Sequence, residues 1–210
     1  NPYELQTIAF AISKDDVADY TIPDNGFIKG EKLESFVNNK VKYTTIDKFR
    51  IPFYAVATNI QTGEEMVFGR GNTGRAVRAS CSIPGIFNPV MIGDKAYVDG
   101  GVISPVAIDV ARRFGADVVI AVDISAGLSS AAPTGTVETI MQAIDIMNNK
   151  MAVIQMKNAD VVIKPKVGYI GSSDFTKRHE AIMEGEKAAA EAMPAINQII
   201  TRLRRGGRLP

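Results

Sequence analysis

Hydrophobic and polar positions fall into clear blocks after residue 50. Residues 52–58 are a nearly continuous apolar run of strand length, rich in residues that favour β-structure. A Thr62-Gly63 turn follows, and residues 65–68 have the pattern of a hairpin partner. A brief strand is expected at 96–98. This region is therefore predicted to be built around a buried strand.

Two later apolar runs have the character of parallel strands. Residues 117–123 place five consecutive apolar residues between two aspartates, which is typical of a strand covered on both faces. Residues 159–163 form a second run, stopped by Pro165. Helical patterns separate the strands, and they are expected at 30–39, 73–79, 106–114, 137–158 and 177–205. This alternation predicts an α/β layered fold with a mostly parallel sheet.

Local signals define some of these helices. Ser104 followed by Pro105 predicts an N-cap and first helical residue for 106–114. Pro194 predicts a kink in the last helix. In 137–158, apolar residues recur at spacings of three and four, which predicts a stripe facing the core. The stripe comprises Ile140, Ile144, Met147, Met151 and Ile154.

The first fifty residues have weaker patterns. Residues 5–12 are apolar without clean periodicity. Nearby acidic residues lack the spacing and closing glutamate of an EF-hand, so a solvated loop is expected rather than a calcium loop. These residues are Asp15, Asp16, Asp19 and Asp24.

Composition and charge exclude several classes of protein. The 210 residues are 46% hydrophobic and 22% charged, a globular profile that fits one domain over 1–210. With 24 basic and 23 acidic residues the net charge is +1, so no nucleic-acid partner is expected. No apolar stretch reaches the roughly 18 residues that span a bilayer. The chain begins with Asn1 rather than methionine, so we expect a processed or partial chain.

One cysteine and one histidine limit the available chemistry. Cys81 excludes an internal disulfide, and with His179 it leaves too few ligands for a Cys/His zinc site. No metal or other cofactor is predicted. Cys81 with His179 as its base is one possible nucleophilic pair. The surrounding small and apolar residues favour a small buried hydrophobe instead.

A glycine-rich segment and a serine-containing set of residues are two further candidate sites. Gly69 to Gly74 satisfies G-x-G-x-x-G before a helix, but the preceding strand looks like a hairpin arm, so a simple loop is favoured over a phosphate site. Ser82, Asp99 and His179 have the chain order of an α/β-hydrolase triad. Ser82, however, lacks the flanking glycines of a nucleophile elbow.

Asp99, Gly100 and Gly101 form the most informative motif. An aspartate at a strand end, followed by two glycines that remove side-chain bulk, can point into a cleft. The same residues can equally form a turn in which the aspartate accepts hydrogen bonds. Spacing alone leaves both interpretations open.

Several segments together resemble one family, the bacterial patatin-like phospholipases. The resemblance is best over about 51–192. Its segments are 55–59, 62–63, 76–90, 97–102, 115–122, 159–165, 174–175 and 185–186. It implies a three-layer α/β/α sandwich and a lipid acyl hydrolase that works through a serine and aspartate dyad, without histidine or cofactor. Asp99 lies in the family's D-G-G/A box and is the implied dyad aspartate, with Gly100 and Gly101 lining the site.

The most serious departure of the sequence from that family concerns the segment that carries its nucleophile. The glycine-rich oxyanion loop and the G-x-S-x-G elbow, which the family places before this region, are not found from Asn1 to Pro210. We therefore expect the C-terminal portion of such an enzyme, inactive alone because nucleophile and oxyanion donors are lacking. The alternative is an inactive fragment or a non-catalytic lipid-binding or ligand-binding module.

Partners and location follow from the same resemblance. A lipid or small ester is the expected substrate, and the N-terminal segment as a separate chain, or a second copy, is a further expected partner. The location is expected to be cytoplasmic or peripheral to the inner membrane, with transient membrane contact. Four C-terminal arginines could touch anionic lipid, but a solvated helix end is favoured. They are Arg202, Arg204, Arg205 and Arg208.

Overall fold

The computed structural model of the chain describes residues 1–22, 25–125, 132–171 and 174–209. The chain divides into two compact units. Unit 1 comprises Asn1–Pro105 and Ala131–Met151, and unit 2 comprises Val106–Ser130 and Ala152–Pro210. Helices and sheets occur together, so the predicted α/β class is confirmed. The single domain over 1–210 stays a prediction.

Unit 1 contains a four-stranded sheet in the order β2-β1-β4-β3. The strands are β1 (Ala55–Asn59), β2 (Glu65–Phe68), β3 (Val90–Ile92) and β4 (Lys95–Asp99). All three pairings are antiparallel, so the expected mostly parallel arrangement is wrong for this sheet. For the β1–β2 and β3–β4 pairs the cause is local: Gly63 and Gly93 take positive φ angles of 72° and 66° in short hairpin turns, which reverse the chain.

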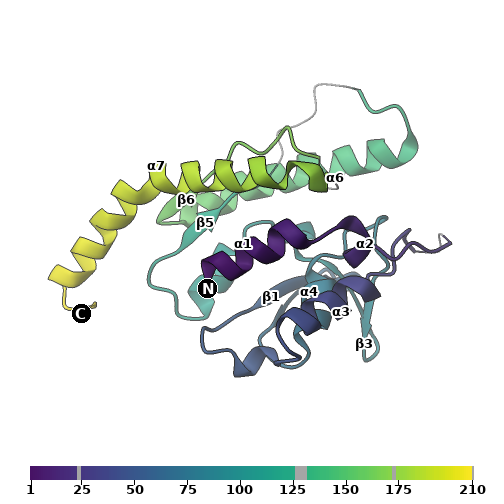
Figure 1. Cartoon of the computed structure of the whole chain (residues 1–210), viewed down its shortest axis with the longest axis horizontal. Helices are drawn as coiled ribbons and strands as arrows, with labels where there is room; N and C mark the ends of the chain where they lie inside the picture. The colour runs from purple at the N-terminus through teal and green to yellow at the C-terminus, as the bar shows by residue number, and fades with distance from the viewer. Residues whose placement is uncertain (23–24, 126–131, 172–173, 210) are drawn as a thin grey trace. The chain divides into compact units, whose positions relative to one another are not determined.

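One helix covers a face of this sheet, and a second helix packs on the first. Helix α4 (Thr73–Ser80) packs on β1 and β4, and α3 (Glu31–Lys40) packs on α4 (Figure 1). Both helices were expected from the sequence. Between α4 and the sheet lies a buried cluster that includes Ala57, Ala79 and Tyr97. The small alanines bring α4 close to the strands and fix the position of its C-terminal end.

The N-terminal region of unit 1 is more helical than its sequence suggests. The aperiodic segment 5–12 falls largely within α1 (Pro2–Ala11), which has a capping box from Asn1 and Glu4 but no buried residue. Asp15 and Asp16 lie in α2 (Lys14–Val17) instead of a loop. Asp24 lies outside the described residues. A short 3₁₀ turn, η1 (Ile46–Lys48), precedes β1.

Unit 2 contains a parallel pair of strands, β5 (Ile120–Val122) and β6 (Val161–Ile163). Ile108, Val119 and Ala121 form its buried cluster. Its helical elements are α5 (Ile108–Arg113), η3 (Met156–Asn158), η4 (Phe175–Lys177) and α7 (Arg178–Arg205). Helix α7 continues through Pro194 and bends along its length (Figure 1).

Three expectations for this part of the chain need correction. Helix α5 begins later than 106, with Ala107 as its N-cap, and Ser104 belongs to the preceding turn, where its N–H donates to the Gly100 carbonyl. Strand β5 is covered on one face only, since Ile120 and Val122 are 44% and 55% exposed. In α6 (Thr136–Gln155) the predicted core stripe is largely exposed. Ile140, Met147 and Ile154 are 54%, 56% and 65% exposed.

A buried carboxylate fixes the ends of the two parallel strands. Asp123 is 2% exposed, and its Oδ1 accepts hydrogen bonds from the Ser125 N–H and hydroxyl. Lys164 Nζ lies 2.7 Å from Oδ2. Burial alone would raise the pKa of Asp123, but Lys164 and Ser125 outweigh it and hold that pKa below its ordinary value.

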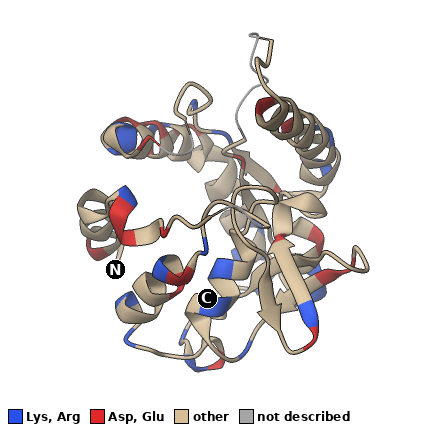
Figure 2. Cartoon of the chain, turned by 90° about the vertical axis from the view of Figure 1, so that its right-hand side faces the viewer, with Lys and Arg blue, Asp and Glu red and all other residues tan. Residues whose placement is uncertain are grey.

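Elsewhere, basic and acidic residues are interspersed over the elements (Figure 2).

Candidate active site

Asp99 ends β4 beside Ala57 of β1. Its carboxylate caps the 3₁₀ turn η2 (Gly100–Val102), because Oδ1 accepts the Gly101 N–H at 2.6 Å. The side chain is half-buried, and this burial raises the pKa of the carboxyl above its ordinary value, while the Gly101 N–H opposes the rise. A carboxylate with a raised pKa is a better proton acceptor than a free one.

The two glycines have different steric roles. A Cβ on Gly100 would lie 2.3 Å from the carbonyl oxygen of Val56, so η2 approaches the backbone of β1 too closely for any side chain. A Cβ on Gly101 would lie 3.0 Å from Asp99 Oδ1 and 3.9 Å from Asn148 Nδ2 of α6. Gly101 therefore leaves room directly beside the carboxylate.

The backbone of Asp99 is held on both sides. Its N–H donates to the Ser82 carbonyl at 2.8 Å, and its carbonyl accepts the Thr58 hydroxyl at 2.9 Å. The sequence analysis missed Thr58. The available signal was a hydroxyl within an apolar strand, since a buried hydroxyl needs a hydrogen-bond partner.

Ser82 is unsuited to act as a nucleophile. It is fully buried, and its hydroxyl donates to the Arg78 carbonyl at 2.8 Å, one turn back along α4. The alternative triad therefore lacks an accessible serine at this position. His179 lies at the start of α7, in unit 2.

Cys81 as a whole residue is exposed, which corrects the expectation of a small buried hydrophobe, although nearby protein atoms still surround its thiol. It follows the last residue of α4. Its thiol pKa is raised to about 11, mainly because the surrounding protein desolvates the sulfur and also because the Asp99 charge opposes ionisation. A thiol with this pKa is almost entirely protonated at neutral pH, so the Cys81 nucleophile has no support.

N–H groups of the segment from Gly69 to Gly74 donate to side chains elsewhere in the protein. Gly71 N–H donates to Asp47 at 3.1 Å, and Gly74 N–H donates to Asn38 at 2.8 Å. Arg75 N–H, the next donor along the chain, is capped by a side chain at 2.8 Å. These donors are therefore occupied by protein oxygens, which agrees with a simple loop rather than a phosphate cradle.

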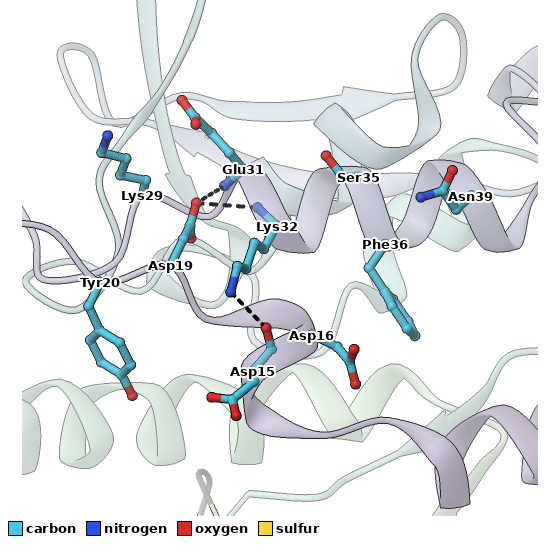
Figure 3. A pocket seen from close by; sticks show the side chains of 10 residues that line it. All are labelled: Asp15, Asp16, Asp19, Tyr20, Lys29, Glu31, Lys32, Ser35, Phe36 and Asn39. Carbon is cyan, nitrogen blue, oxygen red and sulfur yellow. Dashed lines mark hydrogen bonds between the residues drawn. The ribbon is translucent and has the colours of Figure 1, made fainter.

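The N-terminal aspartates border a hollow of about 610 Å³ against α3 (Figure 3). The Asp19 carboxylate accepts the N–H groups of Gly30, Glu31 and Lys32 at 2.7, 2.9 and 3.3 Å. Lys32 Nζ donates to the Asp15 carbonyl at 2.9 Å. Asp19 thus serves as a cap for α3, and no group of acidic, Cys or His residues placed to hold a metal occurs within the described ranges.

The profile of the patatin-like phospholipase family matches residues 7–112, which include the Asp99 motif. This chain belongs to that family. An uncharacterized NTE family protein of Mycobacterium bovis is 28% identical over 211 residues, covering 89% of this chain and 36% of its own length. Patatin-like phospholipase domain-containing protein 7 of Mus musculus is 34% identical over 110 residues, covering 51% of this chain and 8% of its own length.

The chain therefore spans about a third of the length of that mycobacterial relative. The profile match starts before, and ends within, the range 51–192 that carries the resemblance described above. In the part of the chain that the structure describes, no helix combines the length and the hydropathy needed to cross a bilayer.

Proposed function

We propose that this chain is the aspartate-bearing portion of a lipid acyl hydrolase that uses a serine and aspartate dyad. The observation that supports the proposal most directly is the half-buried Asp99 carboxylate, whose pKa is raised and which accepts the backbone N–H of Gly101. Membership of the patatin-like phospholipase family supports a lipid or small ester as substrate.

In the proposed reaction Asp99 accepts the proton of a serine hydroxyl while the serine oxygen attacks the ester carbonyl. The alcohol leaves, an acyl-enzyme forms, and water then releases the acid. The serine comes from outside these 210 residues, because no G-x-S-x-G motif occurs in them. His179 takes no part.

The test is hydrolysis of short p-nitrophenyl esters by the complete protein. Asp99→Asn should lower turnover by about 10²- to 10⁴-fold, the usual contribution of a positioned base. Asp47→Asn is the matched control, since Asp47 also accepts a glycine N–H but lies in η1. Asp47→Asn and His179→Ala should both keep most of the activity.

Unchanged turnover in Asp99→Asn would remove this carboxylate from the mechanism. Residues 1–210 alone should show no turnover above the Asp99→Asn background, because they lack the nucleophile. Turnover by this chain alone would contradict the proposed source of the serine. If the complete protein is inactive towards lipids and esters as well, the non-catalytic module is favoured.

A further inference from the structure

Asp99 stands where β4 gives way to η2, so the regular ladder of the sheet ends at this residue. The peptide group between Asp99 and Gly100 therefore has no partner in the regular ladder. The Thr58 hydroxyl fills this position by donating to the Asp99 carbonyl at 2.9 Å. On the other side, the Asp99 N–H is held by the Ser82 carbonyl at 2.8 Å.

The Thr58 bond acts on the torsion that directs the carboxylate. The Asp99 carbonyl belongs to the peptide between Asp99 and Gly100, so holding its oxygen fixes the Asp99 ψ angle, which is 135°. That angle determines whether the following Gly101 N–H can reach Oδ1 at 2.6 Å. Thr58 is 2% exposed, so water does not readily replace its hydroxyl.

We propose that Thr58 is a positioning residue for Asp99, whose buried hydroxyl fixes the peptide that joins the carboxylate to Gly101. This proposal rests on the proposed function, because it assigns Thr58 to the same site. Thr58 touches no reacting atom. It acts by restricting the Asp99 carboxylate to one orientation at the end of the strand.

Cys81 offers a readout that does not require an active enzyme. It is the one cysteine of the sequence, it is exposed, and the Asp99 charge contributes to its raised thiol pKa. The rate at which iodoacetamide alkylates residues 1–210, measured from pH 7 to 11, therefore reports the position and charge of the Asp99 carboxylate. Asp99→Asn sets the limit in which that charge is absent.

Thr58→Val should move the alkylation profile towards that of Asp99→Asn, with at least about a threefold faster rate at pH 8, equivalent to a fall of about half a pKa unit. Thr58→Ser keeps a hydroxyl and should restore the wild-type profile. Thr73→Val is the matched control: Thr73 is also 2% exposed, and its hydroxyl donates to the Thr44 carbonyl at 2.7 Å, away from Asp99.

Equilibrium unfolding of every variant checks that it is folded, and Thr58→Ala replaces Thr58→Val if the valine variant is not. A wild-type profile in a folded Thr58→Val or Thr58→Ala protein would overturn the proposal. An equal change in Thr73→Val or Thr58→Ser would do the same, since it would indicate a general packing effect.

Activity of the complete protein separates this proposal from the proposed function. We expect Thr58→Val to lower kcat at nearly unchanged KM. Suppose that Thr58→Val changes the alkylation profile while Asp99→Asn keeps full esterase activity. Thr58 would then orient Asp99, but Asp99 would not be the base. If instead Thr58→Val leaves the alkylation profile unchanged while Asp99→Asn is inactive, Asp99 is kept as the base and the positioning role of Thr58 is rejected.

Discussion

The ionised carboxylate of Asp99 opposes folding, because burial raises its pKa above the ordinary value of 3.8. The folded chain therefore binds this proton more tightly than the unfolded chain does. The stability gained from this tighter proton binding is fully present below the pKa of Asp99 in the unfolded chain. It is lost as the pH rises through the higher pKa of Asp99 in the folded chain. A residue that is costly to keep charged is a common feature of catalytic sites.

Asp99→Asn should consequently stabilise the isolated chain at pH 7. The amide carries no charge, and its oxygen can still accept the Gly101 N–H. The gain in free energy of unfolding over wild type should be small near pH 3.5 and should grow as pH rises to 7. Urea titrations at a series of pH values measure it. A gain that is absent at pH 7, or that grows as the pH falls, would contradict the burial account.

At the same scale, the sequence could identify Asp99, Gly100 and Gly101 because an aspartate and two glycines after a strand are visible as a motif. The contacts of Thr58 and Ser82 with Asp99 were not visible. They join positions 41 and 17 residues away from Asp99, and they depend on strand register and on where α4 ends. A single sequence contains neither quantity.

At the scale of elements, η2 and β1 are joined by an approach that only glycine permits. Gly100→Ala should lower the free energy of unfolding by about 1–3 kcal/mol, as expected for overpacking against backbone atoms. Gly101→Ala meets the Asp99 carboxylate oxygen instead of backbone and should cost less. Urea unfolding at pH 7 distinguishes them. Equal losses, or a larger loss for Gly101→Ala, would argue against the close approach of η2 to β1.

The accuracy of the predicted elements depended on whether the tertiary structure used the local pattern. The hairpin of β1 and β2 was predictable because its turn and its buried strand agree. Helix α1 was missed because it buries no residue, so no apolar stripe is needed. Conversely, α6 has the stripe, yet Ile140 and Met147 remain exposed. Periodicity predicts a helix, but it does not specify what the helix packs against.

At the scale of the whole molecule, charge is nearly balanced and interspersed (Figure 2). With a net charge of +1, the chain should give no shift of duplex DNA in a gel assay at 50 mM salt, because too few phosphates would be neutralised. If the chain does bind DNA, the arginines of the C-terminal segment are the residues best placed to contact the phosphates. A shift that weakens steeply with salt and disappears in Arg202→Gln/Arg205→Gln would do so.

The order of the strands in unit 1 has a kinetic consequence. Two hairpins within residues 55–99 form the outer pairings of the sheet, and the central β1–β4 pairing, whose partners are 38–42 positions apart, joins the two hairpins. Forming a short-range contact closes a short loop and so costs less chain entropy than forming a long-range contact. Chains rich in short-range contacts therefore fold faster. The strand that ends in Asp99 can therefore assemble early during synthesis, before the residues of β5, β6 and α7 have been translated.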